Sequence, residues 1–155
     1  MKTVKLKAVG NAIIQTQQRL LDAMLSKDVQ VKMLCKGRGI CATCHVYVTA
    51  NPQMLTPVTE REKMSLSLLT GAQQNSRLAC QARVVGEGIE VEMPRGLYVE
   101  SLTDLEQLIG KRSNVPILHP INGRVLIQEN KIITRTAIMQ LQDVDFNISQ
   151  LDVNR

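Results

Sequence analysis

Four cysteines give this chain its clearest potential for chemistry. Cys35, Cys41 and Cys44 lie within one short segment, and 35 residues separate Cys44 from Cys80. We expect a cytoplasmic chain without a secretion signal, and in such a chain cysteines are better interpreted as metal ligands or redox groups than as disulfides. Thiolates suit iron–sulfur clusters, because sulfur is a soft ligand that spreads charge over iron. We therefore expect the four side chains to meet around one centre.

The segment that holds the first three cysteines is a glycine-containing loop. Five residues lie between Cys35 and Cys41, and two lie between Cys41 and Cys44. Gly37 and Gly39 allow the backbone to curl tightly and to direct its N–H groups at sulfur. Three ligands from one loop and a fourth from a distant element indicate a cluster held between that loop and the rest of a domain.

Three basic residues lie close to these cysteines in the sequence. Lys36 and Arg38 belong to the loop, and Arg77 precedes Cys80 by three residues. Their charges could offset the negative charge of a cluster, which influences its potential. For Lys36 and Arg38 we favour the alternative, in which these long side chains point into water.

Zinc bound by all four thiolates is the alternative to an iron–sulfur cluster. Structural zinc sites usually take their ligands from two short pairs, each with a few intervening residues. Cys41 and Cys44 form one such pair, but Cys35 and Cys80 do not form a second. The spacing therefore favours the cluster.

His45 follows Cys44 directly and raises the question of a Rieske centre, in which two histidines replace two cysteines on one iron. The other histidine, His119, precedes Pro120 far along the chain, and all four cysteines already have a role. We therefore expect His45 to be a packing or hydrogen-bonding residue near the cluster. Redox-coupled proton chemistry is the less favoured interpretation.

The sequence around the cysteines resembles a known family. The segments CKGRGICATCHVYV, residues 35–48, and SRLACQ, residues 76–81, are similar to 2Fe–2S ferredoxins and most similar to their adrenodoxin-type branch. Plant-type members have four residues between their first two cysteines, whereas this chain has five, like the adrenodoxin branch. The resemblance covers about residues 3–94.

This resemblance implies a β-grasp, ferredoxin-like fold and one 2Fe–2S cluster bound by Cys35, Cys41, Cys44 and Cys80. It also implies transfer of single electrons between a reductase and an acceptor enzyme. Residues 55–64, LTPVTEREKM, fall where those ferredoxins carry a partner-binding helix.

The chain departs from the adrenodoxin branch in two respects. The partner-binding helix of that branch is rich in carboxylates, whereas Arg61 and Lys63 here cancel Glu60 and Glu62. The usual partners therefore cannot be assumed. The second departure is an extension after Pro94, which the ordinary family domain lacks.

Positive charge is concentrated in the first part of the chain. Residues 1–94 contain 12 Lys and Arg against 7 Asp and Glu, and residues 95–155 contain 7 of each. Such an excess would either attract an acidic protein face, a nucleic acid or an anionic ligand, or offset a buried negative centre and keep the protein soluble. Aromatic residues make up only 2% of the chain, and we see no helix-turn-helix signature, which speaks against nucleic acid. We expect a redox donor and a redox acceptor with acidic docking faces.

Hydrophobic periodicity predicts the elements that position the cysteines. Alternating apolar residues predict strands, and apolar residues at helical spacing predict helices. Thr59-x-x-Glu62 is a capping-box signature, while Gly10-Asn11 and residues 86–88 indicate turns between paired strands. The expected strands cover residues 3–9, 12–17, 45–49, 78–85 and 89–93, and the expected helices cover residues 18–27 and 60–69. This order predicts an α+β domain over residues 1–94, and the β-grasp, ferredoxin-like fold that the resemblance implies has a mixed sheet.

Residues 95–155 form an extension for which we recognise no family. Periodicity predicts a short helix over 101–109 and a hairpin of 125–128 with 131–134, while 137–142 is ambiguous between strand and helix. The apolar residues predict a packed helix-and-hairpin unit. It would pack on its own ferredoxin domain, on a second copy in a homodimer, or on a docking partner.

Three functions fit these observations. We favour a soluble one-electron carrier, an electron-transfer protein with no substrate turnover of its own. The alternatives are a cluster-based redox or oxygen sensor whose extension signals to a partner, and a detached electron-input subunit of a larger oxidoreductase. No stretch approaches the roughly 20 apolar residues of a membrane-spanning helix, and we expect a cytoplasmic location.

Overall fold

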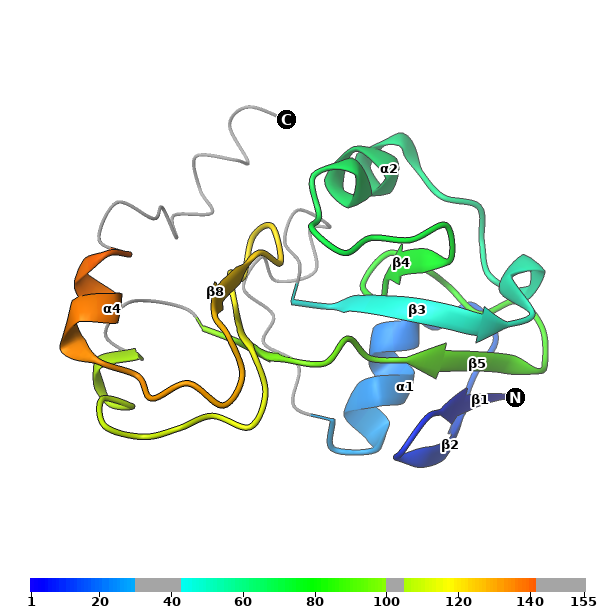
Figure 1. The fold of residues 1–155 in the computed structure, drawn as a ribbon. Helices are drawn as coiled ribbons and strands as arrows, with labels where there is room; N and C mark the ends of the chain where they lie inside the picture. Colours follow the sequence, from blue (N-terminus) through cyan, green and yellow to red (C-terminus); the bar gives the residue numbers. More distant parts are fainter. Residues whose placement is uncertain (30–42, 100–104, 142–155) are drawn as a thin grey trace.

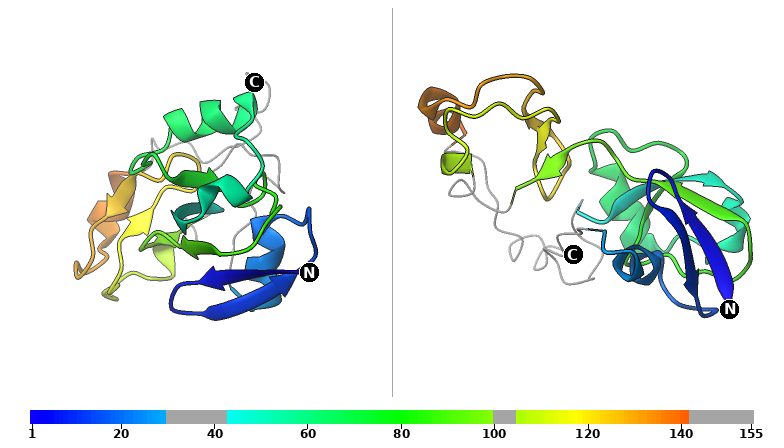
Figure 2. Two further views of the ribbon diagram at one scale, coloured as in Figure 1. Left: turned by 90° about the vertical axis from the view of Figure 1, so that its right-hand side faces the viewer. Right: turned by 90° about the horizontal axis from the view of Figure 1, so that it is seen from below.

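The computed structural model describes residues 1–29, 43–99 and 105–141 of the chain. A mixed five-stranded sheet with two α-helices forms the first part, and a small three-stranded sheet with a helix forms the second (Figure 1). The second part lies at one end of the molecule, beyond the larger sheet (Figure 2). The predicted α+β class, with a mixed sheet and a small extension, is confirmed.

The larger sheet has strand order β2-β1-β5-β3-β4. Only β1 and β5 are parallel, and every other neighbouring pair in this described sheet is antiparallel. Val4 and Leu6 in β1 are buried, as their alternation predicts. The strands are β1 (Lys2–Leu6), β2 (Gly10–Ile14), β3 (His45–Ala50), β4 (Ser76–Leu78) and β5 (Ile89–Glu92).

Two α-helices pack on this sheet. Helix α1 (Leu20–Ser26) contacts β1 and β2, and Leu20, Leu21 and Met24 among its residues are buried. Helix α2 (Glu60–Ser67) lies beside β4, at the edge of the sheet opposite β2 (Figure 1). A short 3-10 helix, η1 (Pro52–Met54), follows β3.

The predicted strand pair of residues 78–85 with residues 89–93 is wrong. β4 ends at Leu78, and β5 pairs with β1 and β3, so that β3 separates β4 from β5. Residues 79–85 instead run beside the start of α1, where the Gln17 amide donates to Val84 O at 2.8 Å. Alternating apolar residues show that a segment is half-buried but do not identify the neighbour with which it pairs.

The extension contains the small sheet, with order β6-β7-β8, and helix α4 (Arg135–Met139). A hairpin is present, but it is formed by β7 (Ile117–Leu118) and β8 (Val125–Ile127). The expected pairing of β8 with residues 131–134 is wrong, since the bridge in that segment joins Ile132 to Arg112. β6 (Leu97–Tyr98) is parallel to β7.

Helical structure in the extension partly matches the expectation. Helix α4 settles the ambiguous stretch in favour of a helix as far as Met139. Of the helix expected over 101–109, Leu105 and Glu106 are helical. Residues 101–104 lie outside the described residues.

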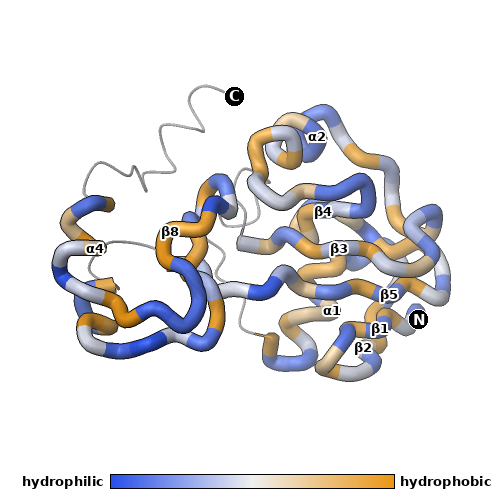
Figure 3. The backbone as a smooth tube through the Cα atoms, viewed as in Figure 1, coloured by the Kyte–Doolittle hydropathy of each residue, from blue (hydrophilic) through white to orange (hydrophobic). Residues whose placement is uncertain are grey.

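Each part has its own cluster of buried apolar side chains, and apolar stretches occur along both (Figure 3). The two parts also contact each other: Tyr98 packs against the first cluster, and the Thr70 amide donates to Asn122 O at 2.7 Å. The extension therefore packs on its own domain, one of the three arrangements expected. Among the described residues, we find no helix with the length and hydropathy to cross a membrane.

Candidate iron–sulfur site

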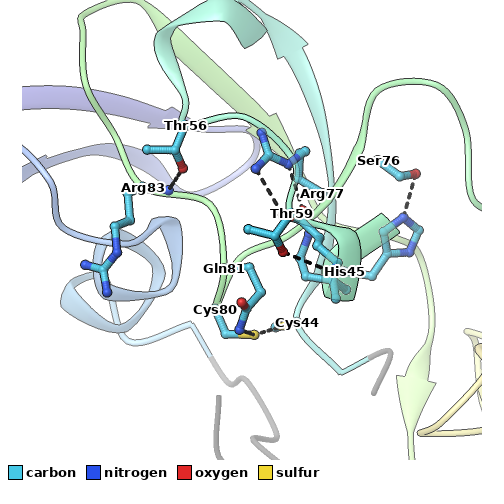
Figure 4. Close-up of polar contacts among 11 residues, drawn as sticks. Cys44, His45, Thr56, Thr59, Ser76, Arg77, Cys80, Gln81 and Arg83 are labelled. Carbon is cyan, nitrogen blue, oxygen red and sulfur yellow. Dashed lines mark hydrogen bonds and ion pairs between the residues drawn. The ribbon is translucent and has the colours of Figure 1, made fainter. Parts of the chain in front are cut away.

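Strand pairing brings Cys44 and Cys80 together. Cys44 immediately precedes β3 and Cys80 follows β4, and these strands are antiparallel with His45 opposite Leu78. The Ala79 amide donates to Cys44 O at 2.9 Å and extends this pairing to the cysteines. The two Sγ atoms consequently lie 3.4 Å apart (Figure 4).

The geometry of the two thiols fits ligands of one metal ion. Cys44 and Cys80 are only 3% and 5% exposed, and neither forms a disulfide. Two thiolates on one tetrahedral ion, with metal–sulfur bonds of about 2.3 Å, lie about 3.8 Å apart. The observed separation is close to this value and well beyond the about 2.05 Å of a disulfide.

The other two predicted ligands, Cys35 and Cys41, lie outside the described residues, as do Lys36 and Arg38. Within 1–29, 43–99 and 105–141, no group of three or more potential metal ligands occurs.

The Arg77 guanidinium forms an ion pair with the Glu62 carboxylate. Arg77 Nε donates to Glu62 Oε2 at 2.7 Å, and Arg77 Nη2 donates to Oε1 at 3.0 Å. The Leu78 amide also donates to Glu62 Oε2, at 3.0 Å. Glu62 is fully buried and Arg77 is 8% exposed. The sequence suggested that the positive charge of Arg77 could offset a cluster, but the Glu62 carboxylate balances this charge.

The expected capping box of Thr59 and Glu62 is only partly correct. Thr59 Oγ1 accepts from the Glu62 amide at 3.2 Å, so the threonine half of the signature is present. The Glu62 side chain points inward to Arg77 and Leu78. A local motif could not reveal this partner, because Arg77 lies 15 residues further along the chain.

Gln81 provides a polar contact to the candidate site. Its Nε2 lies 3.5 Å from Cys80 Sγ and donates to that sulfur (Figure 4). Hydrogen bonds to ligand sulfur favour the more negative, reduced cluster and so raise its potential. The sequence offered only the position of Gln81 next to Cys80 as a signal for this role.

His45 is a buried hydrogen-bonding residue. Its Nε2 lies 2.8 Å from Ser76 Oγ, and its ring packs edge-on against Tyr47 with centroids 4.8 Å apart. Burial lowers the pKa of His45 from its ordinary 6.5 to about 4. The hydrogen-bonding role expected for His45 is confirmed.

Arg19 and Asp22 form an ion pair at the start of α1, which sequence reasoning did not single out. Arg19 Nη2 lies 3.2 Å from Asp22 Oδ1, and the Arg19 amide donates to Asp22 Oδ2 at 2.9 Å. The backbone of α1 adjoins the Cys80 segment, since the Leu21 amide donates to Ala79 O at 3.0 Å. A charged pair therefore lies next to the segment that carries one of the thiols.

Comparison with known proteins places this geometry in a family. The model of the 2Fe–2S iron–sulfur cluster binding domain matches residues 8–85. A 2Fe–2S ferredoxin of Escherichia coli K12 is 36% identical over 78 residues, which cover 50% of this chain and 70% of the relative.

Solved structures agree with the sequence comparison. A cysteine-to-serine variant of putidaredoxin from Pseudomonas putida, in its reduced form, matches with a TM-score of 0.50 and 30% identity, over 60% of this chain and 94% of that chain. A chain of the covalent putidaredoxin reductase–putidaredoxin complex matches with a TM-score of 0.50 and 29% identity, over 60% of this chain and 96% of that one. These similarities confirm the adrenodoxin-type resemblance. The chain therefore belongs to the family of 2Fe–2S ferredoxins, electron-transfer proteins that hold one 2Fe–2S cluster and are not enzymes in their own right.

Proposed function

We propose that this ferredoxin carries single electrons from a reductase to an acceptor enzyme, with its cluster bound by Cys35, Cys41, Cys44 and Cys80. The observation that carries the proposal is the buried Cys44–Cys80 pair, with its sulfurs 3.4 Å apart and not joined by a disulfide. When bound, a 2Fe–2S cluster supplies a centre that accepts and releases one electron. Four protein thiolates would hold such a cluster, and Cys35, Cys41, Cys44 and Cys80 would supply them.

The residues around Cys44 and Cys80 have separate tasks in this proposal. The paired ends of β3 and β4 hold the two thiols at a fixed separation, so that their geometry changes little when the charge of the site changes. Buried apolar neighbours such as Leu78 and Ala79 keep water from the sulfurs on the protein side. Gln81 places a fixed N–H dipole against Cys80 Sγ.

The outward face of α2 is the docking surface that we assign to the partners. Met64 and Leu68, one helical turn apart, are 54% and 56% exposed and form an adjacent pair of apolar side chains on this helix. Arg61 and Lys63 are exposed on the same helix. Glu62 is turned inward, so the exposed part of α2 carries more positive charge than its sequence suggests.

A partner that fits this face has an apolar centre with acidic residues around it. The complex of putidaredoxin with its reductase supports a reductase as one partner. The extension adjoins the same region, because Asn122 O accepts from the Thr70 amide just beyond the end of α2. We therefore infer that residues 95–155 are a unit of their own, with the boundary near Pro94, and that the described part of this extension borders the docking surface.

Metal and sulfide analysis tests the cluster site. Anaerobically purified protein is expected to contain two irons and two sulfides per chain, which is the composition of one such cluster. Cys80→Ser should lose the iron chromophore or shift its potential, whereas Arg83→Lys, a conservative change on the same segment, should do neither. Stoichiometric zinc in a colourless, folded preparation, or a Cys80→Ser protein with the wild-type chromophore and potential, would overturn the assignment.

The docking surface is tested by charge reversal. Lys63→Glu is expected to slow reduction by a surrogate donor with an acidic docking face by about 3- to 10-fold at low salt, with a smaller effect at high salt. Lys131→Glu, an equal charge change in the extension, serves as the control. Equal effects of the two substitutions would show that only the net charge matters and would refute a docking role for α2.

A further inference from the structure

The Arg19–Asp22 ion pair is held in one arrangement. Asp22 Oδ2 accepts from the Arg19 amide at 2.9 Å and from Arg19 Nε at 3.4 Å, while Oδ1 accepts from Nη2 at 3.2 Å. The two side chains are 30% and 29% exposed, so both are largely shielded from solvent. Three hydrogen bonds therefore fix the orientation of the two opposite charges.

Backbone hydrogen bonds place this pair beside the ligand segment. The Leu21 amide donates to Ala79 O at 3.0 Å, and the Leu20 amide donates to Ala82 O at 2.9 Å. These two acceptors lie on either side of Cys80 and Gln81 in the sequence. The first turn of α1, which carries the ion pair, is thus hydrogen-bonded to the backbone on both sides of Cys80, a proposed ligand.

The electrostatics of the pair agree with this placement. The pKa of Arg19 is raised, mainly by its hydrogen bond to Asp22, and the negative charges of Cys80 and Cys44 raise it further. Burial opposes ionisation of Asp22, but the hydrogen bonds from Arg19 outweigh it, so the pKa of this carboxyl is lowered. Both side chains therefore carry full charge at neutral pH.

Arg83 is a second arginine in the same region and serves as a comparison for Arg19. It lies opposite Arg19 in an antiparallel bridge. Its Nη1 donates to the backbone oxygen of Gln17 at 2.8 Å. Among the described residues, no ion pair joins Arg83 to a carboxylate. Arg83 is thus a nearby cation that forms no described ion pair with Asp22, although its charge helps to lower the pKa of that carboxyl.

We propose that the Arg19–Asp22 pair tunes the reduction potential of the cluster through two opposed charges beside Cys80. This inference rests on the proposed ligand role of Cys80 and Cys44. Reduction adds one negative charge to the centre, which Arg19 stabilises and Asp22 destabilises. Because the guanidinium and the carboxylate are locked together, their effects largely cancel, and removal of either one exposes the effect of the other.

Single substitutions are expected to shift the potential in opposite directions. Arg19→Gln leaves the Asp22 carboxylate and should make the potential more negative, whereas Asp22→Asn leaves the Arg19 charge and should make it more positive. We expect about a 3- to 10-fold change in the equilibrium constant for reduction, given an effective dielectric constant of about 20 and partial exposure. A 10-fold change corresponds to about 59 mV for one electron.

Three further variants separate tuning from a merely structural role. The double variant R19Q/D22N should return close to the wild-type potential, and Arg19→Lys, which keeps the charge, should stay near it. Arg83→Gln should produce a smaller shift than Arg19→Gln. Loss of helix capping alone would lower stability in both single variants without opposite changes in potential.

The experiment is a potentiometric titration of each purified holoprotein at low and at high salt, with iron and sulfide measured on the same samples. Opposite shifts that shrink at high salt support the inference. Shifts of the same sign, or no shift in samples that contain two irons per chain, overturn it while leaving the proposed function intact. Wild-type protein without iron would instead overturn the proposed function itself. Where Arg19→Gln fails to fold, Asp22→Asn and Arg19→Lys still decide the sign.

Discussion

Glu62 and Arg77 form a buried, bidentate ion pair, with nitrogen–oxygen distances of 2.7 and 3.0 Å. The pair joins α2 to β4, and β4 leads to Cys80 only two residues after its end. A single carboxylate thereby links the proposed docking helix to the strand that positions Cys80, a proposed ligand of the cluster.

Replacement of Glu62 should destabilise the protein strongly. Glu62→Gln leaves the Arg77 guanidinium buried without a negative partner, and breaking such a pair costs about 3–5 kcal/mol. Denaturant unfolding of the holoprotein measures the loss. Glu60→Gln, on the exposed side of the same helix, should cost less than about 0.5 kcal/mol. Equal costs for the two variants would mean that the buried pair contributes no more than a surface charge.

Gln81 should influence the reduction potential without being required for the cluster. Gln81→Leu removes an N–H donor from Cys80 Sγ, which destabilises the reduced state, so the potential should become more negative. Iron content should remain at the wild-type level. Gln74→Leu, on an exposed loop, is the control and should leave the potential unchanged. A higher potential for Gln81→Leu would contradict this assignment.

His119 should control the contact between the extension and the ferredoxin domain. Its Nδ1 accepts from the Ile121 amide at 3.1 Å and lies 3.4 Å from the Asn122 amide nitrogen, shaping the loop whose Asn122 O binds the Thr70 amide. His119→Ala should therefore accelerate hydrogen exchange at Thr70 by about 10-fold or more, since protection there depends on local opening. The Lys7 amide, bonded to Val91 O within the larger sheet, is an internal control. Unchanged protection of Thr70 would show that the loop keeps its shape without the imidazole.

Asp22 should contribute to stability in a pH-dependent manner. Its pKa is lower in the folded protein than in the unfolded chain, so its contribution is complete above the unfolded pKa of about 3.9 and disappears as pH falls through the folded value. The stability difference between wild type and Asp22→Asn should therefore shrink on acidification from pH 7. Denaturant unfolding at several pH values measures this, with the exposed Asp28→Asn as control. A difference that widens at acidic pH would contradict the sign.

Local elements were predictable because their signals are local. The alternation in β1, the apolar spacing in α1 and the Thr59 cap of α2 all depend on residues within a few positions of one another. Strand partners were not predictable in the same way. Residues 79–85 alternate like a strand yet lie beside α1. They cannot pair with β5 as expected, because β1 and β3 already lie on its two sides.

The candidate site was likewise predictable where its signals are local and not where they depend on contacts between distant segments. The spacing and the family resemblance identified Cys44 and Cys80, and the structure brings these two together. The roles of Glu62, Gln81 and Arg19 depend on contacts between separate segments, which a single sequence does not reveal. Charged residues are common on protein surfaces, so a lone arginine carries no signal until its neighbours are known.

The position of β5 affects how the protein is made. This strand lies in the middle of the sheet, where Val91 is the neighbour of both Leu6 and Val48. During synthesis, all four cysteines therefore leave the ribosome before the strand that joins the two halves of the sheet. Long-range pairings of this kind form late in folding. The scaffold that receives iron and sulfide is complete only after residue 92 has emerged.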